Sequence, residues 1–404
     1  MPEAPAVPGD TAPQTLAYEA EPPVWNASAF DDFLLWAAAN GVSDINLQTG
    51  EPIWLRHHGR MIAATGRPMS GPEMVSIISR LGRGLEADGV LQSGRPIDTA
   101  YDIQRRESGG KVRRCRFRVN ASSCLVGGSD GRQFTLRTLP DRPPQLSALD
   151  PEEAIRESFC PRQGLVMVTG PTGSGKSTLL AAVLADMIGA PDSNRKVVTI
   201  EAPIEFVYDR VQRSAALVSQ WEIPWHLPSF SAGVRNAMRC NPDIIEVGEC
   251  RDTETMSACI DAANTGHAVY TTLHTIGVEA SIQRILGLLE GGGGDAGGRA
   301  IAIMQVLRLI VTQLLLPTVD GRRCAVREFL VFSEEVRQSF LRRPLQDWPA
   351  IAADTLKSRG QPMAVAIERQ WRAGRISADT FTGYAPDHAR TLGITSEGSG
   401  DGVA

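Results

Sequence analysis

The residues with the clearest chemical meaning form the run GPTGSGKST, from Gly170 to Thr178. The run follows an apolar stretch and fits the pattern G-x-x-x-x-G-K-[ST], whose glycines let the backbone curl so that several N–H groups point at phosphate oxygens. Lys176 would reach the β- and γ-phosphates, and the Ser177 hydroxyl would coordinate Mg²⁺. The pattern therefore predicts a nucleotide site. Its predicted binding residues are Gly170, Pro171, Thr172, Gly173, Ser174, Gly175, Lys176, Ser177 and Thr178.

Two acidic segments could supply the carboxylate that orients water and supports the metal ion. Glu201 and Glu205 lie in TIEAPIEF, and Glu249 lies near the end of NPDIIEVGECRD. Both segments contain an apolar, strand-like run, and the strand ends of a doubly wound sheet gather at one edge beside the phosphate loop. We therefore expect Glu205 and Glu249 to lie near the loop. For either acid alone, a solvated charge at a strand end is the common alternative.

Two of the six histidines bracket the apolar run TGHAVYTTLHT, residues 265–275. His274 falls at the end of this predicted strand, which makes it a candidate sensor of the γ-phosphate. His267, at the start of the run, is a second candidate. An isolated histidine is more often structural than catalytic, and neither has the H-E-x-x-H spacing of a zinc site.

Apolar runs that alternate with helix-like segments predict the elements that must position these residues. Such alternation is typical of a parallel sheet flanked by helices. The predicted strands are Leu165–Thr169, Val197–Glu201, Asp243–Val247 and Ala268–Leu273. The predicted organisation is a disordered arm over 1–28, a small α/β domain over 29–140, a proline-bearing linker over 141–149, the phosphate-loop domain over 150–335, a helical region over 336–390 and a flexible tail over 391–404.

Composition narrows the class of protein further. Of 404 residues, 41 are Lys or Arg and 46 are Asp or Glu, and the net charge of −5 disfavours a dedicated nucleic-acid coat. The seven cysteines include no C-x-x-C pair, as expected for reduced thiols in a cytosolic protein. We expect no signal peptide and no membrane segment. The longest apolar stretch, Ala300–Leu316, is short for a membrane span and is predicted to be a core helix.

The chemical segments together resemble the PilT/GspE superfamily of secretion and pilus-retraction ATPases. In chain order they are similar to that family's Walker A (170–178), Asp box (199–206), Walker B (241–252) and His box (265–275) motifs. SDINLQTGEPIWLRHHGRM (43–61) and RFRVNA (116–121) resemble its N-terminal domain, and VTQLLLPTVDGRRCAVREFLVF (311–332) resembles its C-terminal segment. The resemblance implies an α/β protein: a RecA-like P-loop NTPase domain with a mostly parallel sheet, preceded by a small PAS-like domain.

Within the family, the lack of a cysteine quartet argues against the branches with a zinc subdomain. LHTIGVEASIQRIL (273–286) is most similar to the branch of type IVB secretion and conjugative-transfer ATPases represented by DotB and TraJ. The resemblance implies a cytoplasmic homo-hexamer that hydrolyses ATP with Mg²⁺ and docks on an inner-membrane secretion or transfer complex, without direct nucleic-acid binding. The alternatives are a pilus-retraction motor, a weakly hydrolysing nucleotide-gated platform and a RecA-like DNA translocase.

The resemblance also implies residue roles. Glu205 would be the general base, Glu249 would hold Mg²⁺ through water, and His274 would face the γ-phosphate. Arginines of the N-terminal domain would complete the site. The alternative is that these arginines only form a positively charged strand face in solvent and have no role in the site. The matching arginines are Arg116, Arg118 and Arg137. Two departures stand out: Ala202 replaces the usual Asp of the Asp box, and Glu246 replaces an apolar residue of the Walker B strand.

Overall fold

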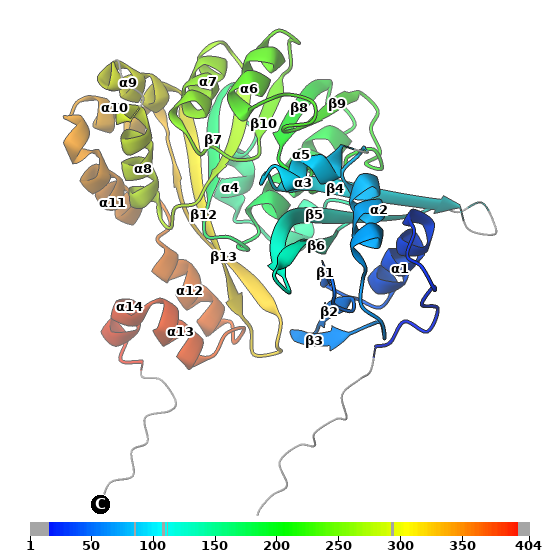
Figure 1. The fold of residues 1–404 in the computed structure, drawn as a ribbon. Coiled ribbons are helices and arrows are strands. Elements are labelled where there is room, and N and C mark those ends of the chain that lie inside the picture. Colours follow the sequence, from blue (N-terminus) through cyan, green and yellow to red (C-terminus); the bar gives the residue numbers. More distant parts are fainter. Residues whose placement is uncertain (1–15, 85, 107–109, 111, 292–294, 395–404) are drawn as a thin grey trace, which may run out of the picture. The chain divides into compact units, whose positions relative to one another are not determined.

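The computed structural model describes residues 16–84, 86–106, 110, 112–291 and 295–394 (Figure 1). The chain divides into two compact units, Met1–Asp141 and Arg142–Ala404. Each unit has its own sheet and its own apolar core, so each is described by itself.

The N-terminal unit is built on a six-stranded antiparallel sheet in the order β3-β2-β1-β6-β5-β4. One face packs on helices and the other carries polar side chains, as alternation along a half-buried strand dictates. The strands are β1 (Asp44–Gln48), β2 (Trp54–His57), β3 (Arg60–Ala63), β4 (Ile97–Arg106), β5 (Val112–Val126) and β6 (Ser129–Leu139), and the helices are α1 (Ala27–Ala39), α2 (Gly71–Leu81) and α3 (Ala87–Gln92). Phe117 and Val119 of β5 point into the core with Phe33 of α1 and Ile77 of α2.

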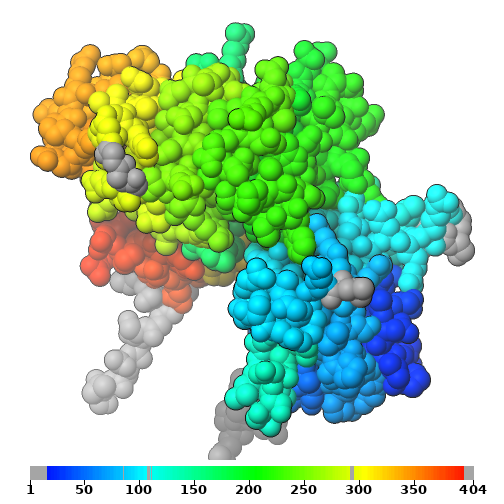
Figure 2. Space-filling view, turned by 45° about the horizontal axis from the view of Figure 1, so that its top comes forward, coloured from blue at the N-terminus to red at the C-terminus, as the bar shows by residue number. Residues whose placement is uncertain are grey.

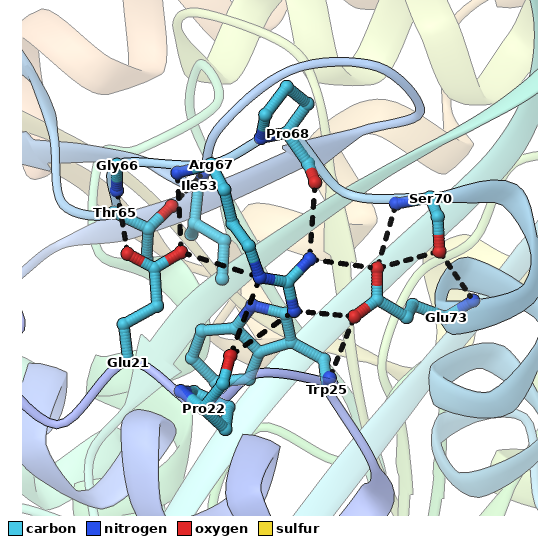
Figure 3. Close-up of polar contacts among 10 residues, drawn as sticks. All are labelled: Glu21, Pro22, Trp25, Ile53, Thr65, Gly66, Arg67, Pro68, Ser70 and Glu73. Atoms are coloured by element: carbon cyan, nitrogen blue, oxygen red, sulfur yellow. Dashed lines mark hydrogen bonds and ion pairs between the residues drawn. The ribbon is translucent and has the colours of Figure 1, made fainter.

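The segment just before α1 corrects the prediction of a disordered arm over 1–28. Residues 1–15 lie outside the described residues, but 16–28 pack on the unit: Trp25 is 1 % exposed and its ring stacks with Tyr18. Glu21 accepts a hydrogen bond from the Gly66 N–H at 2.7 Å, and the Trp25 N–H donates to Glu73 at 2.7 Å (Figure 3). Proline and acid content predicted disorder, whereas buried aromatic rings offset the cost of ordering this segment.

An ion pair anchors the same segment. Arg67 Nη2 donates to Glu73 Oε1 at 2.6 Å, and Arg67 also donates to the Pro22 carbonyl (Figure 3). Burial raises the pKa of Glu73, but hydrogen bonds led by that from Arg67 outweigh it and lower the pKa to about 2. Glu73 therefore stays charged at neutral pH and ties α2 to the segment before α1.

The second unit has a seven-stranded sheet in the order β13-β12-β7-β11-β10-β8-β9, in which only the β12–β13 pair is antiparallel. This confirms the predicted parallel sheet flanked by helices. The strands are β7 (Gly164–Thr169), β8 (Arg195–Glu201), β9 (Ala216–Glu222), β10 (Ile244–Val247), β11 (Ala268–Leu273), β12 (Leu307–Pro317) and β13 (Arg323–Val331).

Helices cover both faces of this sheet, so its central strands are buried throughout. Val166 and Val168 of β7 pack with α5, whereas Leu165 and Met167 pack with the helices of the other face. The unit begins with the 3₁₀ helix η1 (Leu146–Leu149); its α-helices are α4 (Glu153–Ser158), α5 (Lys176–Gly189), α6 (Phe230–Met238), α7 (Thr253–Asn264), α8 (Val278–Glu290) and α9 (Ala296–Val306).

The apolar stretch Ala300–Leu316 corrects a second prediction. It is not one core helix, because α9 ends at Val306 and β12 begins at Leu307. β12 pairs with β7 and β13 and packs on the apolar cores of both sheet faces, so most of its residues are apolar on both sides. Periodicity alone cannot tell such a strand from a buried helix.

The C-terminal helices fall into two groups rather than one region. In Figure 2 the orange group lies against the yellow helices, and the red group lies apart from the orange group, below the yellow-green surface. Trp348 and Phe340 join the main core, whereas Ile367 and Phe381 pack with Leu316 at the end of β12. The helices are α10 (Glu334–Leu341) and α11 (Trp348–Arg359) in the first group, and α12 (Met363–Arg372), α13 (Ala378–Tyr384) and α14 (Pro386–Thr391) in the second, with the 3₁₀ helix η2 (Leu345–Asp347) before α11.

The predicted tail over 391–404 lies outside the described residues from 395 onward. Among the helices that are described, none is both long and apolar enough to span a bilayer.

Candidate nucleotide site

The phosphate loop joins β7 to α5 in the second unit. Gly170, Gly173 and Gly175 have φ values of 141°, 79° and 82°, which only glycine adopts readily. A Cβ on Gly170 would lie 2.4 Å from the Gln313 carbonyl oxygen, so sterics also require glycine there. α5 begins directly after the loop, and its N-terminus turns unpaired N–H groups toward it. The loop thus has the anion-binding form that its sequence predicts.

Lys176, the first residue of α5, lies inside the loop. It is 8 % exposed, and its Nζ donates to the carbonyls of Gly170 at 2.8 Å and Pro171 at 3.0 Å. Burial lowers the pKa of Lys176, and the nearby carboxylates of Glu249 and Glu205 oppose that shift. An ammonium group held at this point is ready to meet phosphate oxygens.

The structure brings the predicted acids and one histidine to the same edge of the sheet. Glu205 follows β8, Glu249 follows β10 and His274 follows β11, at the carboxyl ends of strands beside the loop after β7. Glu249 Oε1 lies 3.1 Å from His274 Nε2, and its other oxygen lies 2.6 Å from Arg251. Burial raises the pKa of Glu249, but Arg251 and His274 outweigh it and lower the pKa. Glu249 is therefore a carboxylate at neutral pH. Lys176 lies near this carboxylate and near Glu205.

Glu201 and Glu246 form a different kind of acidic site beneath this edge. Glu201 accepts hydrogen bonds from Thr199 Oγ1 at 2.6 Å and from Gln220 at 3.2 Å, yet burial raises its pKa to about 7. Glu246 is 7 % exposed; burial, Glu201 and Glu205 raise its pKa well above the usual range. Its Oε2 has no hydrogen-bond partner among the described residues. The neighbours of the unusual Walker B acid are thus other acids, and protonation is the state that such surroundings favour.

His267 lies away from this cluster. It precedes β11, at the amino end of the strand, whereas the other candidates lie at carboxyl ends. Its Nδ1 is 2.9 Å from the Ala262 carbonyl and 3.2 Å from Thr265 Oγ1, so its contacts are with the end of α7. These contacts fit a structural role.

The candidate arginines lie on the polar face of the N-terminal sheet. Arg118 of β5 and Arg137 of β6 are directly opposite each other, and Arg116 is two residues before Arg118 on the same face. Arg116 is 3 % exposed, which excludes the simple alternative of a solvated strand face for that residue. Each arginine has an aspartate partner: Arg116–Asp102 at 3.6 Å, Arg118–Asp98 at 2.9 Å and Arg137–Asp44 at 2.8 Å.

Sequence reasoning missed two polar residues: one in β12 that contacts the loop, and one in β13 that contacts the first. Gln313 Nε2 donates to the Ser174 carbonyl at 2.7 Å, and Arg327 Nε donates to Gln313 Oε1 at 2.8 Å. The available signal was their position: both are polar residues within strongly apolar strands, where a buried polar side chain needs a partner.

The site can hold a metal ion only together with a ligand. Among the described residues no group of three His, Cys, Asp or Glu side chains could bind a metal by itself. Ser177 is exposed at the start of α5, and Glu249 is charged and close to Lys176. These residues fit Mg²⁺ that keeps several waters and binds phosphate oxygens at the same time.

A glycine loop of this form, with a buried lysine and nearby acids at the carboxyl edge of a parallel sheet, defines a P-loop NTPase of mixed α/β fold. The family of type II/IV secretion system proteins matches residues 37–366, so the chain belongs to that family.

Solved structures and relatives agree with this assignment. The crystal structure of the ATPase DotB from Legionella pneumophila is 43 % identical, covers 93 % of this chain and 98 % of its own, and superposes with a TM-score of 0.83. The pilus retraction motor PilT with bound ADP is 28 % identical, with 88 % and 97 % covered and a TM-score of 0.72. The type IV pilus retraction ATPase PilT of Pseudomonas aeruginosa is 31 % identical over 76 % of this chain and 83 % of its own. The enzyme class is therefore that of the secretion and pilus ATPases.

Proposed function

We propose that this ATPase binds Mg²⁺–ATP at the loop 170–178 and hydrolyses it to power a type IVB-like secretion system or conjugative transfer. The observation that carries the proposal is the buried Lys176, whose Nζ lies against the Gly170 and Pro171 carbonyls inside a positive-φ glycine loop, with the carboxylates of Glu205 and Glu249 nearby. The likeness to DotB over 93 % of the chain supports the secretion branch.

The proposed roles follow from the charge state of each group. Lys176 and the loop N–H groups would bind the phosphates, and Mg²⁺ would add positive charge beside them. Glu249 stays ionised because Arg251 and His274 lower its pKa, so it suits water-mediated support of the metal. Glu205 would accept a proton from the attacking water, and His274 would face the γ-phosphate. Glu201, whose pKa is near 7, suits a supporting position better than a metal contact.

Two further parts of the proposal concern assembly. Arg116, Arg118 and Arg137 would act on the phosphates from the N-terminal unit, with 141–149 as the linker between the domains. Each would have to exchange its aspartate for phosphate, which couples nucleotide binding to domain movement.

The working form would be a cytoplasmic homo-hexamer that docks on an inner-membrane secretion or transfer complex. We propose no direct contact with nucleic acid.

The second candidate function is type IV pilus retraction, which the 31 % identity to the Pseudomonas retraction ATPase favours. A third is a nucleotide-gated platform that hydrolyses little, because Ala202 removes one acid and Glu246 is a buried acid whose pKa is raised well above the usual range.

The deciding experiment measures ATP turnover and mass by light scattering on the purified chain, with and without Mg²⁺–ATP. We expect a hexameric mass and turnover that needs Mg²⁺. Binding without turnover would favour the platform, and a chain that does not bind ATP would overturn the proposal. Relaxase genes beside the coding sequence would favour transfer, and pilin genes would favour retraction.

A further inference from the structure

A continuous line of buried polar contacts runs from the phosphate loop to the start of the second unit. Gln313 of β12 donates to the Ser174 carbonyl at 2.7 Å, and Arg327 of β13 donates to Gln313 Oε1 at 2.8 Å. At its far end, Arg327 Nη2 donates to the Leu149 carbonyl at 2.8 Å, and Nη1 donates to the Asp150 carbonyl at 3.2 Å. The loop and the segment after the linker are thus joined through two side chains.

The chemistry of these groups fixes the direction of every bond. A guanidinium group only donates, so Gln313 must turn its carbonyl oxygen toward Arg327. Its NH₂ group then has to face Ser174, where a carbonyl oxygen accepts from it. The amide of Gln313 thus accepts on one side and donates on the other, which links the two ends of the line through one planar group.

Core packing does not explain an arginine at this place. Arg327 is 2 % exposed, and burial lowers its pKa, which Glu152 opposes from 3.4 Å. A buried ion pair is rarely worth more than an apolar pair of the same size. The guanidinium group differs from an apolar side chain because it donates hydrogen bonds to several groups at once: Gln313 of β12, Glu152 and two backbone carbonyls.

The segment at the far end has the features of a hinge. Asp150, the residue directly after η1, has a left-handed φ of 43°, a conformation that is unusual for a non-glycine residue. A pocket of about 680 Å³ lies beside it, bounded by Asp150, Glu152, Arg327 and Arg369. The segment therefore has both a strained residue and adjacent space into which side chains can rearrange.

We propose that Gln313 and Arg327 form a positioning relay that reports phosphate binding at the loop to the linker. Phosphate binding at the loop N–H groups would shift the Ser174 peptide, and the relay would pass that shift to the carbonyls of residues 149 and 150. Neither residue is catalytic, because both act through backbone groups of others. The inference rests on the proposed function, since it requires the loop to bind nucleotide.

The test combines hydrogen exchange of the linker amides with steady-state kinetics on the full-length protein. Wild-type protein is compared with and without a non-hydrolysable ATP analogue. Gln313→Glu is the decisive variant: a carboxylate still accepts from Arg327 but cannot donate to Ser174. Gln338→Glu is the matched control, because Gln338 lies on α10 and its amide contacts Glu334 instead.

We expect nucleotide to change the exchange of residues 142–150 in wild-type protein and in Gln338→Glu. In Gln313→Glu that change should disappear and kcat should fall about tenfold, while the Kd for the analogue stays within about threefold. A loss confined to KM, or an unaltered linker response in Gln313→Glu, would overturn the relay.

A second variant keeps the test decisive if Gln313→Glu does not fold. Glu152→Gln, at the linker end, keeps a hydrogen-bonding side chain but loses the charge toward Arg327, and it should weaken the linker response in the same way. A wild-type chain that binds and hydrolyses ATP without any linker response also overturns the relay and leaves the proposed function intact. A wild-type chain that does not bind the analogue contradicts the proposed function itself.

Discussion

The two units of the chain hold their charges in opposite ways. In the N-terminal unit, the candidate arginines lie on one sheet face, and each has an aspartate within ion-pair distance. In the second unit, Lys176 and Glu246 are buried and Glu201 is half-buried, and burial is the largest cause of each pKa shift. The first arrangement gives every cation a nearby anion, whereas the second places charge where it is costly.

This difference indicates which unit is built around the chemistry. Ionisable groups with strongly shifted pKa values cluster at functional sites more often than elsewhere. The P-loop unit shows that signature in the raised pKa values of Glu201 and Glu246, whereas the strong shift of Glu73 in the N-terminal unit comes from a structural ion pair, so the P-loop unit should retain the binding chemistry by itself. The arginine face can contribute only by giving up existing ion pairs, which makes it suited to a step that depends on movement.

The largest effect is expected from Lys176→Ala. The substitution removes the cation of the loop, so kcat/KM should fall on the order of 10⁴-fold, as for other single cations on a transferring phosphoryl group. ATP turnover and the circular dichroism spectrum check activity and fold. Lys357→Ala, at an exposed position of α11, is the matched control and should behave as wild type. Normal turnover in Lys176→Ala would remove the basis for assigning chemistry to the P-loop unit.

The next effect concerns Glu205→Gln and Glu249→Gln. Both substitutions keep size and hydrogen bonding but lose charge, so each should retain ATP binding and lose on the order of 10³-fold in kcat. Turnover and equilibrium binding of a fluorescent ATP analogue separate the two quantities. If the Glu205 variant turns over normally, the base role passes to Glu249.

The arginine face is expected to give a smaller effect. Ala variants of Arg116, Arg118 and Arg137 should each lower kcat by about 10²-fold and change the Kd for ATP much less, because the gain arises as charge develops on the phosphoryl group. Arg132→Ala is the control: Arg132 lies in β6, the strand that contains Arg137, and pairs with Asp88 instead. If all four variants lose activity equally, the effect is loss of structure and the arginine proposal fails.

Much of this picture could be predicted from local signals in the sequence. The glycine spacing predicted the loop because its φ values demand glycine, and strand-end positions predicted that Glu205, Glu249 and His274 would converge. Alternating apolar runs predicted the parallel sheet. Each of these predictions depends on short sequence patterns whose physical cause is local to the segment that contains the pattern.

The errors occurred where the cause lies elsewhere in the chain. Trp25 is ordered because its ring stacks with Tyr18 and packs in the core, and its backbone N–H donates to Glu73. Composition cannot show such contacts. β12 is a strand because β7 and β13 lie on either side of it. The polar residues Gln313 and Arg327 have meaning only through partners more than a hundred residues away, Ser174 and Leu149.

The smallest effect is expected from Glu246→Leu, and it tests the comparison from the side of stability. Burial and neighbouring acids raise the pKa of Glu246 in the folded state, so the folded chain keeps a proton that the unfolded chain releases above about pH 4.5. The free energy of unfolding therefore falls as pH rises from about 5 to 8. Replacing the acid by leucine removes this penalty and returns the position to the apolar type that a central strand favours.

We expect Glu246→Leu to raise the free energy of unfolding of the second unit by about 1–3 kcal/mol at pH 8 and by less at pH 5. Urea unfolding at the two pH values measures the difference, and turnover should change less than about fivefold because Glu246 has no proposed role in binding the phosphates or the metal. Glu246→Gln is the control, since it removes the titration but leaves a buried polar group, so its gain should be smaller than that of leucine. Some pH dependence should remain in both variants, because the pKa of Glu201 is also raised, to about 7. Equal pH dependence in the wild type and in both variants would mean that Glu246 titrates as an ordinary acid, and the contrast between an ion-paired face and a costly buried site would then rest on Lys176 and Glu201 alone.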